Sequence, residues 1–241
     1  MLNIITGRTG SGKTRMIRSM AAEIAENNPG KAVIIVPEQF SFDTERGMLS
    51  VLGNIKINNV EVLSFSRIAE KLISQYGKTD KKTADDGIRA VLMSRAVEAL
   101  EGEISIYNRY KKYPALIREL LDFHREIKKC SISNQQLAEV SSKVKNTSFS
   151  SKLSELSLIF DCYDSLVSDK FIDSSDFLDM LYELLWDVEY FKGKTVFIDA
   201  FSGFSAQEYN IIEQILRQAD DVYVTFCCDT ARNSGRYELF Y

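Results

Sequence analysis

The chain carries, close to its N-terminus, the stretch Gly7-Arg8-Thr9-Gly10-Ser11-Gly12-Lys13-Thr14. This stretch follows a β-rich run and precedes a segment, residues 13–26, whose apolar residues recur at helical spacing. In such a strand–loop–helix unit, glycines let the backbone close around phosphate groups, and the N–H groups that begin the helix point at the anion. The stretch therefore predicts a P-loop that binds a purine nucleoside triphosphate through residues 7–14.

Three side chains have expected roles at this predicted P-loop. Lys13 is expected to reach the β- and γ-phosphates, and Thr14 to place its hydroxyl on Mg²⁺. A P-loop enzyme also needs a carboxylate at a strand end for the metal, and the apolar run at residues 196–198 ends on Asp199. We therefore expect ATP and Mg²⁺ as cofactors, Thr14 and Asp199 at the metal, and Lys13, Thr14 and Asp199 as catalytic residues. The alternative for Asp199 is a strand that merely ends on a polar residue.

The residue after Asp199 does not favour hydrolysis. Ala200 stands where many hydrolysing P-loop motors carry the glutamate that orients water. Gln207 and Glu208 lie further along the chain, and their spacing assigns them no role. We expect these 241 residues to bind the nucleotide and to hydrolyse it slowly or not at all.

Hydrophobic periodicity divides the chain into a sheet-forming core and a helical insertion. Parallel strands need crossover connections, which are usually helices, and strand–helix units in series predict an α/β P-loop NTPase fold with a parallel sheet. The middle of the chain shows helical periodicity and hardly any β-branched run. We expect a core of residues 1–78 and 192–241, with 79–191 as an all-α insertion. The expected strands cover residues 2–6, 31–36, 60–63, 195–199 and 221–226.

Composition bounds the class of protein. The chain is 45% hydrophobic and 27% charged, which is typical of a globular protein, and its apolar runs stop at strand length, as at residues 33–36. No basic leader or small-residue cleavage site opens the chain, so we expect a cytoplasmic protein without membrane spans. Four cysteines lack zinc-site spacing and are expected to be buried thiols, and the single histidine, His124, is expected to be a packed residue.

A cluster of basic and aromatic residues stands out against the formal net charge of −4. Interleaved cations and aromatic rings suit nucleic acids, because the cations neutralise phosphates while bases stack on the rings. The alternative is a solvated helix end whose tyrosine rings pack beneath it. The cluster consists of Tyr107, Arg109, Tyr110, Lys111, Lys112 and Tyr113.

Four blocks of sequence, in order along nearly the whole chain, resemble the AddB family, the B subunits of bacterial AddAB helicase-nucleases. The blocks are residues 7–14, 35–42 (Ile-Val-Pro-Glu-Gln-Phe-Ser-Phe), 62–67 (Val-Leu-Ser-Phe-Ser-Arg) and 197–208 (Phe-Ile-Asp-Ala-Phe-Ser-Gly-Phe-Ser-Ala-Gln-Glu). The resemblance implies a superfamily one helicase-like motor domain whose inserted subdomain is the helical block. It also implies an AddA-type partner subunit and a role in processing double-strand DNA ends for recombinational repair.

By the same resemblance, the second and third blocks stand where related helicases contact single-stranded DNA. The DNA-facing candidates are Gln39, Phe40, Ser64, Phe65 and Arg67, with a place in the core as the alternative for the two phenylalanines. Family members are far longer and carry a C-terminal nuclease domain with an iron–sulfur cluster, so we expect a piece of a longer hydrolase without that domain. The alternative interpretations are a stand-alone P-loop kinase or nucleotide switch, and a P-loop relic that only scaffolds a partner.

Overall fold

The computed structural model describes residues 1–77 and 81–228, and the chain forms two compact units. The first unit comprises Met1–Gly77 and Leu178–Tyr241, and the second comprises Lys78–Phe177. The expected boundary between residues 78 and 79 lies outside the described residues, as do the last residues of the expected core, 229–241. Within the described residues, no helix is both long enough and apolar enough to cross a membrane.

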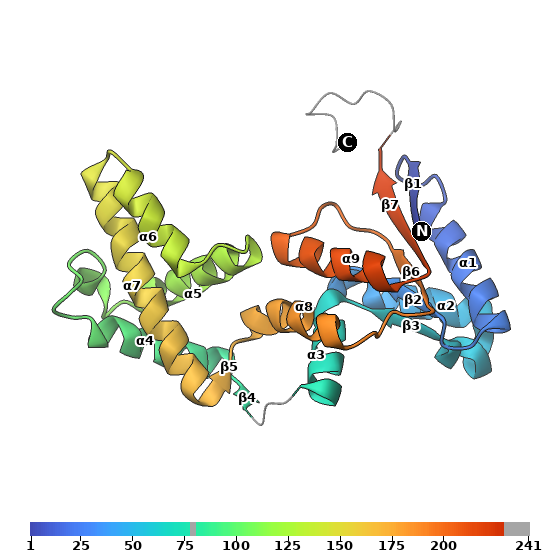
Figure 1. The fold of residues 1–241 in the computed structure, drawn as a ribbon, viewed down its shortest axis with the longest axis horizontal. Helices are drawn as coiled ribbons and strands as arrows, with labels where there is room; N and C mark the ends of the chain where they lie inside the picture. Colours follow the sequence, from blue (N-terminus) through green and yellow to red (C-terminus); the bar gives the residue numbers. More distant parts are fainter. Residues whose placement is uncertain (78–80, 229–241) are drawn as a thin grey trace. The chain divides into compact units, whose positions relative to one another are not determined.

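A five-stranded parallel sheet forms the centre of the first unit. Its strand order, β1-β7-β6-β2-β3, places the last strand of the unit beside the first. The α/β fold with a parallel sheet was predicted from the sequence, whereas this order was not. The strands, labelled in Figure 1, are β1 (Leu2–Gly7), β2 (Ala32–Ile35), β3 (Val60–Leu63), β6 (Thr195–Ile198) and β7 (Asp221–Cys227).

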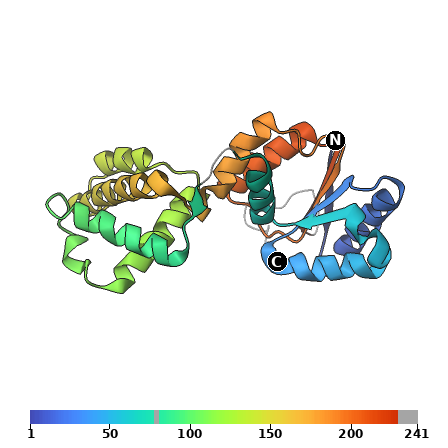
Figure 2. The ribbon, with the colours of Figure 1, turned by 90° about the horizontal axis from the view of Figure 1, so that it is seen from below.

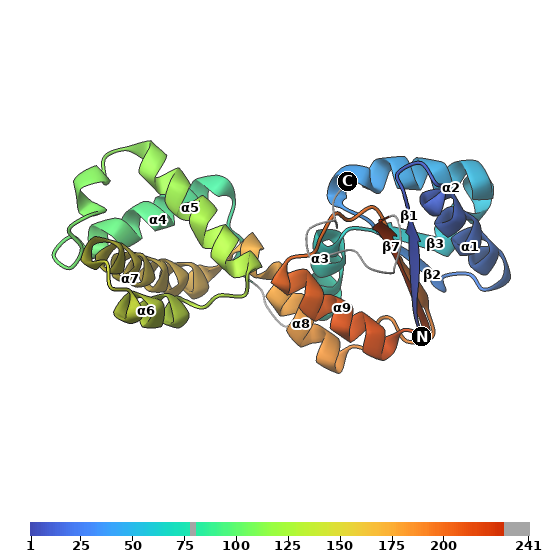
Figure 3. The same cartoon turned by 90° about the horizontal axis from the view of Figure 1, so that it is seen from above.

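Helices cover both faces of this sheet. Figure 3 shows α1 and α2 on one face and α3, α8 and α9 on the other. Every residue of β2 is buried, which explains why this strand has an unbroken apolar sequence. Short 3₁₀ turns at Glu38–Phe40 and Ile57–Asn59 flank α2. The helices are α1 (Lys13–Asn27), α2 (Ser41–Lys56), α3 (Phe65–Tyr76), α8 (Phe177–Asp187) and α9 (Ala206–Gln218).

The helix boundaries follow from local chemistry. The side chain of Ser64 accepts a hydrogen bond from the backbone N–H of Arg67 and so begins α3. Ser205 and Glu208 form a reciprocal capping box that begins α9. Gly53, at φ 71°, interrupts the helical conformation of α2 one residue after Leu52, where the periodicity of the sequence ends.

The helical unit ends earlier in the chain than the insertion predicted from the sequence, residues 79–191: its last residue is Phe177. Residues 178–191 belong to the first unit, where Leu181 and Leu185 on α8 are fully buried. Gln218, at the end of α9, donates hydrogen bonds from its side chain to the carbonyl oxygens of Leu185 and Val188 at 2.6 and 3.1 Å. A helical period cannot show against which unit a helix packs, because α8 is amphipathic in either case.

The second unit is a small helical bundle, coloured green to yellow in Figure 2. Its core contains the fully buried side chains of Met93, Ile159, Phe160 and Tyr163. A two-residue parallel ladder, β4 (Lys82–Thr83) with β5 (Phe171–Ile172), joins the two ends of the unit and is too short to be predicted from the sequence. The helices are α4 (Asp86–Ala99), α5 (Pro114–Lys129), α6 (Asn134–Lys143) and α7 (Thr147–Lys170), with 3₁₀ turns at Asn108–Tyr110 and Ser174–Asp176.

Candidate functional site

The loop between β1 and α1 needs its glycines. Gly10 and Gly12 adopt φ angles of 79° and 93°, a region that side chains with a Cβ atom disfavour. Gly7 has an ordinary φ, but a Cβ atom there would lie 2.5 Å from Oγ of Ser11. Thr9 Oγ1 lies 3.1 Å from Sγ of Cys227 and so connects the loop to β7. The loop conformation therefore depends on Gly10 and Gly12, whereas a side chain at Gly7 would require Ser11 to change its rotamer.

Lys13, the first residue of α1, folds back over the loop. Its ammonium group donates hydrogen bonds to the carbonyl oxygens of Gly7 and Arg8 at 2.6 and 3.0 Å. Gly12 gives α1 no side-chain cap, and the first turn of the helix, which includes half-buried Thr14, holds no acidic residue. An uncapped helix N-terminus beside an ammonium group attracts anions. These residues fit a phosphate group.

Asp199 lies immediately after β6 and is 3% exposed. Its Oδ1 accepts a hydrogen bond from the hydroxyl of Thr225 on β7 at 2.5 Å, and its backbone N–H donates to the carbonyl oxygen of Ile35 at 3.0 Å. Because β7 separates β6 from β1, Asp199 lies two strand spacings from β1, about 10 Å. The glycine-rich loop and Asp199 thus share the carboxyl edge of the sheet, with Thr225 between their strands. Among the described residues, no cluster of three or more His, Cys, Asp or Glu side chains is placed to hold a metal ion by itself.

A cavity of about 340 Å³ opens at the same edge, beside the carboxyl ends of β2, β3 and β6. The backbone turns sharply at Ala200, whose φ of 66° is rare for a residue with a side chain. After this turn, Phe201 packs on Phe65 with ring centroids 5.5 Å apart. Lining residues include Gln39, Ser64, Phe65, Phe201, Ser202 and Gly203.

The five DNA-facing candidates separate into two groups. Gln39, Ser64 and Phe65 line the cavity, although Ser64 and Phe65 are each only 3% exposed. Phe40 is 40% exposed and does not line it, so it is not a core aromatic. Arg67 also lies outside the lining, and its guanidinium group forms an ion pair with Glu45 at 2.7 Å.

Glu208 and Gln207 are held by structural contacts. Glu208 accepts a hydrogen bond from the N–H of Ser205 at 2.7 Å within the capping box, although its side chain also lines the cavity. Gln207 is 3% exposed and donates to Oδ2 of Asp179 on α8 at 2.9 Å. A carboxylate already used as a helix cap is poorly placed to activate water.

Sequence reasoning missed the cavity residues Phe201, Ser202 and Gly203. They lie inside the fourth block of the resemblance, which was the available signal.

The prediction that all four cysteines are buried is wrong: Cys130 and Cys227 are exposed, and Cys162 and Cys228 are half-buried. Cys130 and Cys228 lie just beyond the ends of α5 and β7, where burial depends on neighbouring elements rather than on local pattern. The prediction for His124 is confirmed, since it is fully buried.

The fold and site define a class: an α/β protein with a parallel sheet, a glycine-rich loop and a buried aspartate at one sheet edge, and a helical insertion. The family model described as "ADDB, N-terminal" matches residues 4–241. The chain therefore belongs to the AddB N-terminal family, as the sequence blocks predicted.

Individual relatives agree with this assignment. The chain is 29% identical over its whole length to the B subunit of the ATP-dependent helicase/deoxyribonuclease of Thermoanaerobacter sp. (strain X514), and it covers 21% of that protein. It is 31% and 33% identical, over 95% of its length, to the proteins of the same name from Acetivibrio thermocellus and Clostridium kluyveri, covering 20% of each. The chain thus spans about a fifth of the length of the curated relatives it matches.

Proposed function

We propose that this chain is the nucleotide-binding, DNA-contacting N-terminal part of an AddB-type helicase/deoxyribonuclease subunit. In this proposal the longer protein is a hydrolase that works with an AddA-type partner subunit on double-strand DNA ends. The relatives' names support a DNA-degrading enzyme of more than one subunit. The proposed cofactors are ATP and Mg²⁺; the iron–sulfur cluster and the cytoplasmic location stay predictions.

One observation carries the proposal: the three candidate features share a single edge of the sheet. The glycine-rich loop follows β1, Asp199 follows β6, and the cavity with Gln39 lies beyond β2, β3 and β6. In open parallel α/β sheets, ligands bind outside the carboxyl ends of the strands. A nucleotide at the loop and a DNA strand at the cavity would therefore occupy neighbouring parts of one surface.

The loop residues have distinct proposed tasks. Backbone N–H groups at the start of α1 bind phosphate oxygens, and the ammonium group of Lys13 exchanges the carbonyl oxygens of Gly7 and Arg8 for the terminal phosphates. Thr14 and Asp199 bind the magnesium ion or its water shell. Because Thr225 occupies one oxygen of Asp199, the other oxygen is the one proposed to face the metal.

The cavity is the proposed contact for single-stranded DNA. The amide of exposed Gln39 hydrogen-bonds to a base or phosphate, while the neighbouring rings of Phe65 and Phe201 form an apolar wall. Arg67 requires release from Glu45 before it contacts a phosphate. Phe40, exposed beside Gln39, offers a ring for a base.

Hydrolysis by this part alone is proposed to be slow or absent. Ala200 has no group that activates water, and Glu208 is bound in the cap of α9. Catalysis of phosphoryl transfer rests on positioned charges, and a complete motor commonly supplies further cations from other domains or partners. The fragment is therefore a nucleotide binder, and cleavage of DNA belongs to the longer protein.

The test is calorimetric titration of the 241-residue chain with Mg²⁺-ATP, with and without oligo(dT). Lys13→Ala and Asp199→Asn are each expected to weaken ATP binding at least ten-fold. Lys145→Ala, an exposed lysine in the second unit, is the matched control and leaves binding unchanged. If the wild-type chain does not bind ATP, the proposal that it binds a nucleotide is refuted. The result would then favour a P-loop relic that only scaffolds a partner.

The DNA part is tested separately by the fluorescence anisotropy of labelled oligo(dT). Gln39→Ala is expected to weaken oligo(dT) binding several-fold while leaving ATP affinity unchanged, because Gln39 lies beyond β2 rather than at the loop. Gln135→Ala, at an exposed position on α6, is the matched control. Equal oligo(dT) affinity of the wild type and Gln39→Ala would contradict a DNA contact at this cavity.

A further inference from the structure

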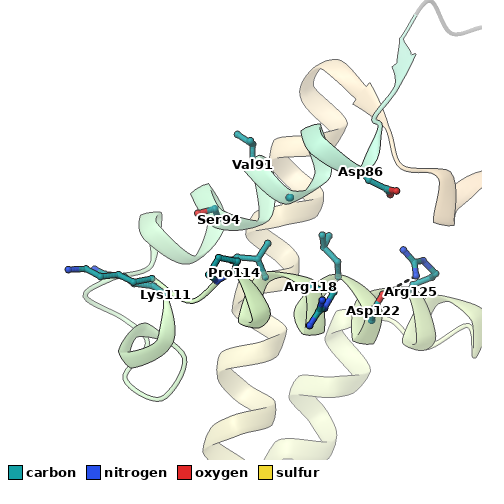
Figure 4. A pocket seen from close by; sticks show the side chains of 12 residues that line it. Asp86, Val91, Ser94, Lys111, Pro114, Arg118, Asp122 and Arg125 are labelled. Carbon is teal, nitrogen blue, oxygen red and sulfur yellow. Dashed lines mark hydrogen bonds and ion pairs between the residues drawn. The ribbon is translucent and has the colours of Figure 1, made fainter.

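A groove with a volume of about 610 Å³ runs between α4 and α5 of the second unit. Figure 4 shows Val91 and Ser94 on α4 along one side, with Arg118 and Arg125 along α5 on the other. Arg118 and Arg125 are seven residues apart, so they lie two helical turns, or about 10 Å, from each other on one face of α5. The helical unit therefore presents a walled groove rather than a plain convex surface.

The floor of the groove is apolar and continuous with the core of the unit. Ile117, directly before Arg118, and Leu121, between the two arginines, lie on α5. Each is 9% exposed, and both belong to the core of the unit. Ala90 of α4 and Pro114 at the start of α5 complete this floor. Since the core holds the floor in place, a ligand would meet a preformed surface.

The two ends of the groove differ in charge. We call Lys111, Lys112 and Arg118 the cationic end; the first carboxylate of the lining, Asp122, lies one helical turn beyond Arg118. Lys111 contacts Glu101 outside the lining, whereas Lys112 and Arg118 form no ion pair with any residue that the structure describes. At the other end, Asp122 contacts Arg125 at 3.0 Å, and Asp86 adds a second carboxylate. An anion would therefore bind at the cationic end.

Two exposed tyrosine rings adjoin the cationic end. Tyr110 and Tyr113 are 54% and 62% exposed, and their ring centroids are 6.3 Å apart. Tyr113 directly precedes Pro114 of the groove floor, and Tyr110 directly precedes Lys111. Burial and the negative charge of Glu155 raise the pKa of half-buried Tyr107, which packs against the core. The packed-ring alternative thus holds for Tyr107 and fails for the other two.

Buried Glu155 anchors the turn that precedes these rings, and the N–H groups of Tyr110 and Tyr113 donate to the carbonyl oxygens of Tyr107 and Tyr110, at 3.0 and 2.9 Å. The carboxylate of Glu155 on α7 accepts hydrogen bonds from the N–H groups of Ser105, Ile106 and Tyr107, at 2.8 to 3.1 Å. Glu155 is itself 7% exposed. Exposed rings on an anchored segment lose little conformational freedom on binding, which favours affinity.

We propose that the cationic end and the Tyr110–Tyr113 pair form a binding site for single-stranded nucleic acid. Lys112 and Arg118 contact phosphates, and the two rings stack on bases. This site shares no residue with the cavity beside Gln39. It rests on the proposed function only because both proposals have DNA as the ligand. An acidic polypeptide would also satisfy the cations, but exposed ring faces at the same end favour bases.

The experiment measures the fluorescence anisotropy of labelled oligo(dT) with the full 241-residue chain over a range of salt concentrations. The double variant Lys112→Gln/Arg118→Gln is expected to bind at least ten-fold more weakly. Its salt dependence, the slope of log K against log salt, is expected to fall by about 1.4, since each phosphate contact on a single strand contributes about 0.7. Tyr110→Ala/Tyr113→Ala is expected to lose at least five-fold in affinity with an unchanged slope.

Controls separate this proposal from the proposed function. Lys145→Gln/Lys152→Gln removes the same charge from exposed positions of the same unit and is expected to bind as the wild type does. If Lys112→Gln/Arg118→Gln keeps both affinity and salt slope, the groove proposal is overturned, whatever Gln39→Ala does. If Gln39→Ala alone has no effect, the cavity proposal fails and the groove stands. If Lys112→Gln/Arg118→Gln loses binding to poly-glutamate but binds oligo(dT) as the wild type does, the proposal is overturned and the groove is assigned to acidic protein segments.

Discussion

The hydroxyl of Thr225 on β7 donates a 2.5 Å hydrogen bond to Oδ1 of Asp199 at the end of β6. The two residues are 4% and 3% exposed, so the carboxylate has little access to water. Thr225 is also paired with Ile5 of β1, two residues before Gly7, which begins the glycine-rich loop. The orientation of Asp199 therefore depends on the strand that separates it from the loop.

Replacing Thr225 by valine is expected to lower the free energy of unfolding by about 1.5–3 kcal/mol, because a hydrogen bond to a buried charged group is lost at nearly constant side-chain shape. Urea denaturation measures this change. Thr6→Val, on an exposed position of β1, is the matched control and should stay within about 0.5 kcal/mol of the wild type. Equal losses in both variants would show that the Asp199 contact adds nothing.

Gly7→Ala is expected to destabilise the protein by about 0.5–1.5 kcal/mol, because its Cβ atom would lie 2.5 Å from Oγ of Ser11 and force this exposed side chain to change its rotamer. Adding Ser11→Ala removes that oxygen and is expected to recover most of the loss, as measured by thermal or urea unfolding. Gly102→Ala, where a Cβ atom meets nothing within 4 Å, is the control. A double variant no more stable than Gly7→Ala would contradict this steric explanation.

The carboxylate of Glu61 on β3 provides a pH-dependent contribution to stability. Burial opposes its ionisation, but hydrogen bonds from Lys71, Tyr190 and Lys194 outweigh burial and lower its pKa from 4.5 to about 2. The Tyr190 hydroxyl lies 2.6 Å and the Lys194 ammonium 3.1 Å from this carboxylate. A folded-state pKa below the unfolded value means stabilisation above about pH 4.5 that is lost as the pH falls toward 2.

Glu61→Gln is therefore expected to lower the free energy of unfolding at pH 7 by up to about 3 kcal/mol, since each pKa unit corresponds to about 1.4 kcal/mol. Urea denaturation at a series of pH values should show the difference in free energy of unfolding between Glu61→Gln and the wild type shrinking as the pH falls from 4.5 to 2. Glu70→Gln, at an exposed position on α3, serves as the control. A difference that stays constant across this pH range would exclude the proposed linkage.

Asp173→Asn is expected to cost about 3–5 kcal/mol of unfolding free energy, because Arg89 would keep a buried charge without its buried counter-ion. The guanidinium Nε of Arg89 lies 3.2 Å from Oδ2 of Asp173, and the Tyr163 hydroxyl donates to the same oxygen at 2.6 Å. The Arg89 and Asp173 side chains are 3% and 1% exposed. Urea denaturation followed by circular dichroism reports this loss, since the second unit is helical.

Glu126→Gln removes one partner of an exposed ion pair with Lys129 and is the comparison for Asp173→Asn. Exposed pairs contribute little, so this change should cost less than about 1 kcal/mol. If Asp173→Asn costs no more than Glu126→Gln, the Arg89–Asp173 pair does not stabilise the helical unit.

The sequence by itself determined the elements and their class. Helices such as α5 and α9 begin and end where proline, capping residues and apolar spacing place them, since these signals act within one or two turns. The buried strands β2 and β6 were equally visible as apolar runs. Four sequence blocks also sufficed to predict the family to which the chain belongs.

Only the tertiary structure decided which of these elements meet. The order β1-β7-β6-β2-β3, the packing of α8 with the first unit and the cavity beside Gln39 join segments far apart in the chain. The Thr225–Asp199 hydrogen bond and the Arg89–Asp173 pair span 26 and 84 residues. Local patterns encode period and exposure, whereas such contacts depend on how the buried faces of many elements fit together at once.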